Sequence, residues 1–163
     1  MPLVSRLLFT CSAIGLTVGA HVADFSPSHM FNDRWPVHAK FHTGQTLSMS
    51  VFLALLTILF AWRKTSDRRE AIYATAGFAA AYWVTQAVAI AYPNTAFYDP
   101  EFTPAHAFTL GLPIQAYFEI LFISLIALAS WLALRRAAHW SDSSAVAAGL
   151  QTDPLLKAAG TRI

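Results

Sequence analysis

Charged residues are scarce in this chain. Only 12% of its 163 residues are Asp, Glu, Lys or Arg, whereas 56% are hydrophobic. Soluble domains carry roughly 25% charged residues, so this composition argues against a soluble domain and indicates an integral membrane protein. The net charge of +2 is also too small to indicate nucleic-acid binding. The composition therefore predicts a lipid bilayer as the first partner and excludes nucleic acid as one.

Cysteine and the common catalytic motifs are equally sparse. Cys11 is the single cysteine, so the chain cannot form an intramolecular disulfide, and a lone cysteine inside an apolar run is most often a small packing residue. The sequence contains no nucleophile elbow, no glycine-rich phosphate loop and no CxxC pair. These absences argue against hydrolase triads and against nucleotide binding.

Four long apolar segments are present instead. They cover about residues 3–22, 41–62, 71–92 and 113–134. Each is close to the roughly 20 residues that a helix needs to cross a membrane, and the connecting lengths favour up-down-up-down packing. We therefore predict an all-α fold, an integral membrane four-helix bundle over residues 1–138. Residues 139–163 are rich in Ala, Ser and Gly and are predicted to form a mobile cytoplasmic tail.

Orientation in the membrane follows from the basic residues. They gather near the start of the first segment, between the second and third, and after the fourth: Arg6, Arg63, Lys64, Arg68, Arg69, Arg135, Arg136, Lys157 and Arg162. The positive-inside rule then predicts a multi-pass protein of a bacterial inner membrane, with both termini in the cytoplasm and both long loops outside. A second interpretation of the first segment is a signal peptide, because Val18-Gly19-Ala20 resembles a cleavage site.

The connection between the first two segments has chemistry that a plain loop does not need. The stretch from Asp24 to Gln45 reads DFSPSHMFNDRWPVHAKFHTGQ and holds three of the six histidines. Polar residues next to a membrane segment cost free energy unless something uses them. This stretch is therefore the first candidate for a functional site. The residues in it that we predict to bind a substrate are Asp24, His29, Asn32, Trp35 and Gln45.

Polar residues also recur at one depth in the four segments. With a rise of about 1.5 Å per residue, four of them lie about 24–27 Å from the basic residues at the cytoplasmic end of their segment: Asp24, Gln45, Gln86 and Glu119. Unpaired polar groups are costly in lipid, so these side chains are expected to face the bundle interior. They would line one pocket that opens toward the outer face, with His38 and His42 near its rim.

Glu119 is the strongest candidate for chemistry. A carboxylate inside a membrane span is a functional candidate by default, and acid-base catalysis needs one group that gives a proton and another that accepts it. Glu119 and His42 are predicted to be these groups, with His38 as a further catalytic residue. The remaining residues predicted to bind the substrate are Trp83, Gln86, His106 and Gln115. Gln45 and Gln86 could equally form only interhelical hydrogen bonds.

The two long loops end alike. Residues 33–39 and 101–107 both read acidic-x-x-Pro-x-His-Ala. The pattern is either a duplicated helical hairpin or a helix-start signature that arose twice. In the first case His38 and His106 are symmetry partners across the bundle. Together with His42, one helical turn from His38, they form the alternative site, which would hold a metal ion or a haem.

The polar stretch also carries a family resemblance. The motif consists of Ala23-Asp24-Phe25, Ser28-His29, Phe31-Asn32, Trp35-Pro36, His38-Ala39-Lys40-Phe41-His42 and Gly44-Gln45. It resembles the core of a family of small four-helix membrane proteins from bacteria and fungi, a domain of unknown function. The resemblance covers all four segments and implies the fold but no activity. A looser likeness, in architecture and residue types only, is to sterol isomerases of the emopamil-binding type.

The sequence leaves three functions open. The leading hypothesis is that the protein binds a small lipophilic molecule and processes it by isomerase-like or cyclase-like acid-base chemistry, without a cofactor. The first alternative is a histidine-ligated metal or haem protein. The second is a non-catalytic binding or assembly subunit, in which the polar layer only joins helices.

Overall fold

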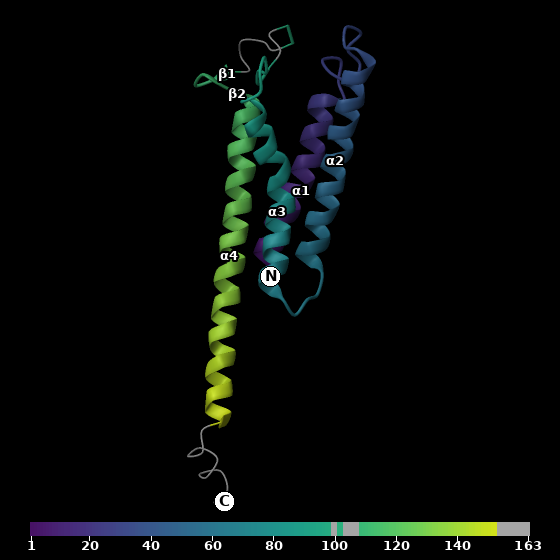
Figure 1. Ribbon diagram of the computed structural model, residues 1–163. Helices are drawn as coiled ribbons and strands as arrows, with labels where there is room; N and C mark the ends of the chain where they lie inside the picture. The colour runs from purple at the N-terminus through teal and green to yellow at the C-terminus, as the bar shows by residue number, and fades with distance from the viewer. Residues whose placement is uncertain (99–100, 103–107, 153–163) are drawn as a thin grey trace, which may run out of the picture.

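The computed structural model describes residues 1–98, 101–102 and 108–152, and within them it contains four helices and one short hairpin. The helices are α1 (Leu3–Asp24), α2 (Val37–Trp62), α3 (Arg68–Ala89) and α4 (Ile114–Thr152), and the strands are β1 (Phe108–Thr109) and β2 (Leu112–Pro113). The predicted all-α fold is therefore confirmed. Figure 1 shows the helices lying side by side, with α4 extending well beyond the other three.

The helices form a closed ring in chain order. α1 packs against α2 and α4, and α3 packs against the same two helices, so α2 and α4 are diagonal to one another. Figure 1 shows the N-terminus, the α2–α3 connection and the far end of α4 at one end of the bundle, and the two longer connections at the other. This is the predicted up-down-up-down arrangement. We call the first end the basic end, because it carries Arg63, Lys64 and Arg68 in the α2–α3 connection and at the start of α3.

Local sequence explains where α3 begins and where the hairpin turns. Asp67 caps α3, since its side chain accepts a hydrogen bond of 2.9 Å from the backbone N–H of Glu70, three residues on. The hairpin turn is Leu110-Gly111, in which both residues have positive φ angles of 52° and 79°. Such a two-residue turn matches the twist of its strands, and β1 and β2 pair antiparallel across it.

Small side chains fill the helix contacts. The buried residues of α1 include Ser5, Ser12 and Ala13, and those of α2 include Ser50 and Ala54. Small residues let helix backbones approach closely, which is how membrane helices associate. The hydroxyl of Ser12 donates to the Leu8 carbonyl in its own helix, so its burial leaves no donor unpaired.

Large apolar side chains lie mostly on the outside of the bundle. Exposed residues include Leu55 and Leu59 of α2 and Ile120 and Leu128 of α4. A surface of this kind is unfavourable in water but matches the hydrocarbon of a bilayer. The interior of small residues and the apolar exterior together fit a membrane bundle.

Three of the described helices are long and apolar enough to cross a membrane. They are α1, α2 and residues Ile114–Ala138 of α4. They contain the predicted spans 3–22, 41–62 and all but the first residue of 113–134. α3 has 22 residues but is not among these helices, and it ends at Ala89, so the predicted span 71–92 stays a prediction.

α4 differs from the predicted domain boundary. It continues without a break through residue 138 to Thr152, so the first part of the predicted tail 139–163 is helical. Alanine, a residue of high helix propensity, recurs in that part of the chain. The mobility of the tail stays a prediction, and residues 153–163 lie outside the described part of the chain.

Candidate functional site

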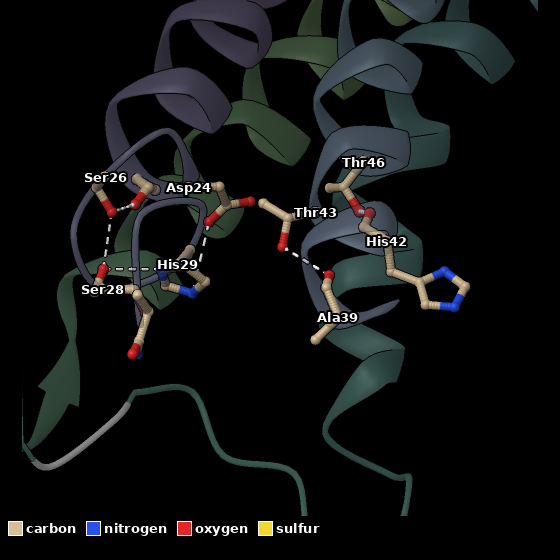
Figure 2. Close-up of polar contacts among 10 residues, drawn as sticks. Asp24, Ser26, Ser28, His29, Ala39, His42, Thr43 and Thr46 are labelled. Carbon is tan, nitrogen blue, oxygen red and sulfur yellow. Dashed lines mark hydrogen bonds and ion pairs between the residues drawn. The ribbon is translucent and has the colours of Figure 1, made fainter. Parts of the chain in front are cut away.

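The connection between α1 and α2 folds back on itself. The Ser26 and Ser28 hydroxyls lie 2.9 Å apart, and the Ser28 hydroxyl lies 2.8 Å from His29 Nδ1. His29 Nε2 then lies 3.8 Å from Asp24 Oδ1, as Figure 2 shows. The His29 ring also meets the Trp35 ring edge-on at 4.9 Å. The structure therefore brings together three of the predicted site residues: Asp24, His29 and Trp35.

Asn32 has a structural role in this connection. It is buried, its side-chain amide donates to the Ser28 carbonyl at 3.2 Å, and its Oδ1 accepts from the backbone N–H of Arg34 at 2.9 Å. These are turn-forming hydrogen bonds of the kind that asparagine makes with its own neighbourhood. Arg34 in turn forms an ion pair with Glu101, which ties this loop to the second long loop.

His38, His42 and Gln45 share one face of α2, as their spacing predicts. His42 Nε2 lies 3.1 Å from His38 Nε2, and His42 Nδ1 lies 3.1 Å from Gln45 Oε1. All three residues are exposed, however. The expectation that Gln45 faces the bundle interior is wrong, because α2 buries the opposite face through Thr43, Leu47 and Ser50.

Figure 2 shows the same division. The His42 side chain points away from α1, whereas Asp24 and His29 lie on the other side of α2's first turns, with Thr43 toward them. The predicted catalytic pair of Glu119 and His42 is therefore not brought together. Glu119 lies on α4, which is diagonal to α2, and its side chain is buried while that of His42 is exposed.

A second set of buried polar atoms lies on α3 and α4. Glu119 is only 6% exposed. Three polar atoms there are buried and have no hydrogen-bond partner: Trp83 Nε1, Gln86 Oε1 and Glu119 Oε1. An unsatisfied buried donor or acceptor costs about 1–3 kcal/mol. Three such atoms in two adjoining helices form the most conspicuous polar defect of the bundle.

The helix register puts these residues close in height. The Trp83 ring stacks on the Phe122 ring, with centroids 4.6 Å apart and planes 15° apart. α3 and α4 run antiparallel (Figure 1), so three residues after Trp83 and three residues before Phe122 reach the same level. Those residues are Gln86 and Glu119, one turn above the stack. Gln115, half-buried, is one further turn along α4.

Phe122 forms the floor of this group, and it was not among the predicted site residues. A Cβ added to Gly15 of α1 would lie 2.3 Å from Phe122 Cζ, so the ring fits between Gly15 and Trp83 only because residue 15 has no side chain. The i, i+3 spacing of Glu119 and Phe122 is visible in the sequence, but the contact with Gly15 is not.

The described residues offer two nitrogen ligands for a metal but not a complete site. His38 and His42 present their Nε2 atoms 3.1 Å apart, which is a separation that one tetrahedral ion can bridge. Within the described ranges, no group of three or more His, Cys, Asp or Glu side chains could hold a metal ion. His106, the third predicted ligand, lies outside the described residues.

A comparison with known protein families identifies the family of this chain. Residues 8–139 match a family model described as a family of unknown function, DUF6640. The chain belongs to this family. The match spans α1 from residue 8 onward, α2, α3 and the membrane-length part of α4, so it confirms the resemblance carried by the polar stretch. No curated protein and no solved structure matches the chain.

Membership of this family assigns no activity to the group between α3 and α4 or to the polar face of α2. The family match includes both. The occurrence of the family in bacteria and fungi and the likeness to sterol isomerases stay expectations. The function of this chain therefore depends on the geometry of its own side chains.

Proposed function

We propose that the protein binds a small lipophilic molecule whose polar head is held between α3 and α4 by Trp83, Gln86 and Glu119. The observation that carries this proposal is the set of three buried polar atoms without partners. Trp83 Nε1 can only donate, and Gln86 Oε1 can only accept. A head group with one acceptor and one donor, such as a hydroxyl, would satisfy both atoms.

The surroundings of these atoms favour a lipophilic ligand over a soluble one. Trp83, Phe122 and Phe118 provide aromatic rings next to the polar atoms, with Phe118 and Phe122 stacked at 6.4 Å. Binding sites for small molecules are mostly apolar with a few well-placed polar groups. A bilayer supplies such ligands at high concentration, and Phe118 is half exposed on the outside of α4.

Glu119 is the residue proposed for acid-base chemistry at this position. A carboxyl group can give a proton to a bound substrate or take one from it. The partner first predicted, His42, is exposed on α2, which is diagonal to α4. We therefore propose ligand binding as the primary activity, with proton transfer between Glu119 and the bound molecule as a further, catalytic activity.

The test is the set of molecules that co-purify with the protein. Purified protein is extracted with organic solvent and its bound small molecules are measured by mass spectrometry. We expect one lipophilic species in near-stoichiometric amount in the wild type, and its loss in Gln86→Leu and in Glu119→Gln. Gln45→Leu is the matched control, because it makes the same change on the exposed face of α2.

Folding separates this proposal from the assembly alternative. Each variant is checked by circular dichroism and by its unfolding midpoint in detergent. Folded Gln86→Leu protein without the ligand supports a site. If the wild type carries no such molecule and Gln86→Leu and Glu119→Gln mainly unfold the bundle, the buried polar atoms join helices and the proposal is refuted.

We also infer that the basic end faces the cytoplasm and that the α1–α2 and α3–α4 connections lie outside an inner membrane. The support is the concentration of Arg and Lys at that end. Reporter fusions measure this directly. A C-terminal fusion should be fluorescent as green fluorescent protein and inactive as alkaline phosphatase, and the reverse result would overturn the orientation.

A divalent metal site on α2 is the second candidate function. Its support is the 3.1 Å separation of His38 Nε2 and His42 Nε2, together with the Gln45 oxygen 3.1 Å from His42 Nδ1. A hydrogen bond from Nδ1–H to Gln45 would fix the tautomer whose Nε2 can bind a metal. Elemental analysis of untagged protein tests it, since the metal must be stoichiometric and must disappear in His38→Ala but not in His21→Ala.

A further inference from the structure

A basic cavity lies at the end of the bundle opposite the proposed ligand site. It has a volume of about 410 Å³ and is formed where α1, the end of α2, the α2–α3 connection, α3 and α4 meet. Five of its lining residues are basic: Arg6, Arg63, Lys64, Arg68 and Arg136. Among the described residues, no carboxylate lines it. A volume of this size is typical of small-molecule sites, and the positive charge of the lining favours an anion as the ligand.

Two of the arginines are held against aromatic rings. The Arg6 guanidinium lies over the Trp62 ring at 5.5 Å, and that of Arg63 lies over the Phe60 ring at 4.4 Å. Stacking of this kind leaves the N–H edge of a guanidinium available. Arg6 Nε is buried and has no hydrogen-bond partner, so its N–H group is an unused donor in the cavity lining.

The positive potential is visible at a neighbouring group. Burial, followed by the charges of Arg6 and Arg68, lowers the pKa of the Met1 amino group, which also lines the cavity. The cationic form of that amine is therefore disfavoured by its basic neighbours. An anion bound in the cavity would relieve this repulsion.

The position of the cavity identifies the source of the anion. Trp62 stands between two lining residues, Ala61 and Arg63, and Trp131 lies half exposed two residues before the lining residue Ala133. Tryptophans in membrane proteins gather at the level of the lipid head groups. Apolar side chains, including Phe60 and Ile72, also line the cavity and suit the glycerol and first acyl carbons of a lipid.

We propose that this cavity binds the phosphate head group of an anionic phospholipid of the surrounding membrane. Arginine binds phosphate through two parallel N–H donors, and basic pockets between membrane helices are suited to anionic head groups. The lipid would bridge α1, α3 and α4 at the basic end and so hold the bundle together. This inference is independent of the proposed function, which concerns the other end of the molecule.

Native mass spectrometry of the intact protein in mild detergent tests the proposal. Phosphatidylglycerol and phosphatidylcholine with the same acyl chains are titrated separately. We expect the wild type to bind phosphatidylglycerol at least tenfold more tightly. In Arg6→Gln/Arg136→Gln this preference should fall by roughly tenfold or more. The two lost cations attract the net negative head group of phosphatidylglycerol but not the zwitterionic head group of phosphatidylcholine, each by roughly a factor of five.

The matched control is Arg69→Gln/Arg135→Gln. It removes the same charge from neighbouring residues that are exposed and do not line the cavity. The control should keep the preference within about twofold of the wild-type value. If both double variants lose it equally, the lipid recognises only surface charge and the cavity proposal is overturned.

Two further arms keep the test decisive. If Arg6→Gln/Arg136→Gln fails to fold, Arg136→Gln alone is used, because Arg136 is exposed and its loss leaves the packing intact. Added inorganic phosphate distinguishes the two sources of the anion. Displacement of phosphatidylglycerol by low millimolar phosphate would assign the cavity to free phosphate and overturn the lipid assignment, whereas no displacement supports it.

Discussion

The tightest contact of the bundle gives the sharpest prediction. A methyl group at residue 15 would lie 2.3 Å from Phe122 Cζ and 2.5 Å from Cε1. Carbon atoms in contact are about 3.5–4.0 Å apart, so the ring has to retreat by more than about 1 Å. It cannot do so freely, since its plane stacks on Trp83 at 4.6 Å. Gly15→Ala therefore forces Phe122 and Trp83 to move together.

The expected loss of stability follows from two opposing effects. Overpacking of a filled site costs about 1–3 kcal/mol, and replacing glycine by alanine inside a helix gains about 1 kcal/mol. Gly19→Ala in the same helix is the matched control, because a Cβ there has no neighbour within 4 Å and receives only the gain. Gly15→Ala should thus be about 1–3 kcal/mol less stable than Gly19→Ala.

Equilibrium unfolding in mixed micelles, followed by circular dichroism and tryptophan fluorescence, measures the difference. Phe122→Leu combined with Gly15→Ala should recover part of the loss, since the smaller side chain makes room for the methyl group. Equal stability of Gly15→Ala and Gly19→Ala would show that Phe122 yields without cost. In that case the packing argument for the floor of the α3–α4 group is refuted.

Two other substitutions test separate parts of the reasoning. Gln86→Met should stabilise the ligand-free protein by about 1–2 kcal/mol, because it replaces an unpartnered buried carbonyl with an apolar side chain of similar length. A loss of stability in the same unfolding assay would reveal a hydrogen bond at Gln86 and remove one support of the proposed site. Asp67→Ala should destabilise the protein by about 1 kcal/mol through loss of the α3 cap, whereas Asp67→Asn should stay within a few tenths of the wild type; equal losses in the two variants would contradict a capping role.

The chain itself determines the elements and their depth. Apolar length defines the helices, and the Asp67-Arg68-Arg69-Glu70 sequence defines the start of α3 because a carboxylate there pairs with free backbone N–H groups. Counting residues from the basic end predicts nearly equal heights for Gln86 and Glu119, and the stacking of Trp83 on Phe122 agrees. The rise per residue is a property of the helix alone, so the height of a residue along its helix can be estimated without knowing how the helices pack.

Only the tertiary structure decides which way each helix face points. Periodicity shows that His38, His42 and Gln45 share a face, but a helix in a bilayer has apolar surroundings on every side, so the pattern does not distinguish inside from outside. α2 packs against α1 and α3 through its face with Ser50 and Ala54, so the face with His38, His42 and Gln45 points outward. Packing of Phe122 against Gly15 accompanies the burial of the Gln86 and Glu119 polar atoms. Such contacts join distant segments and depend on the shapes of both helices, so no local sequence pattern predicts them.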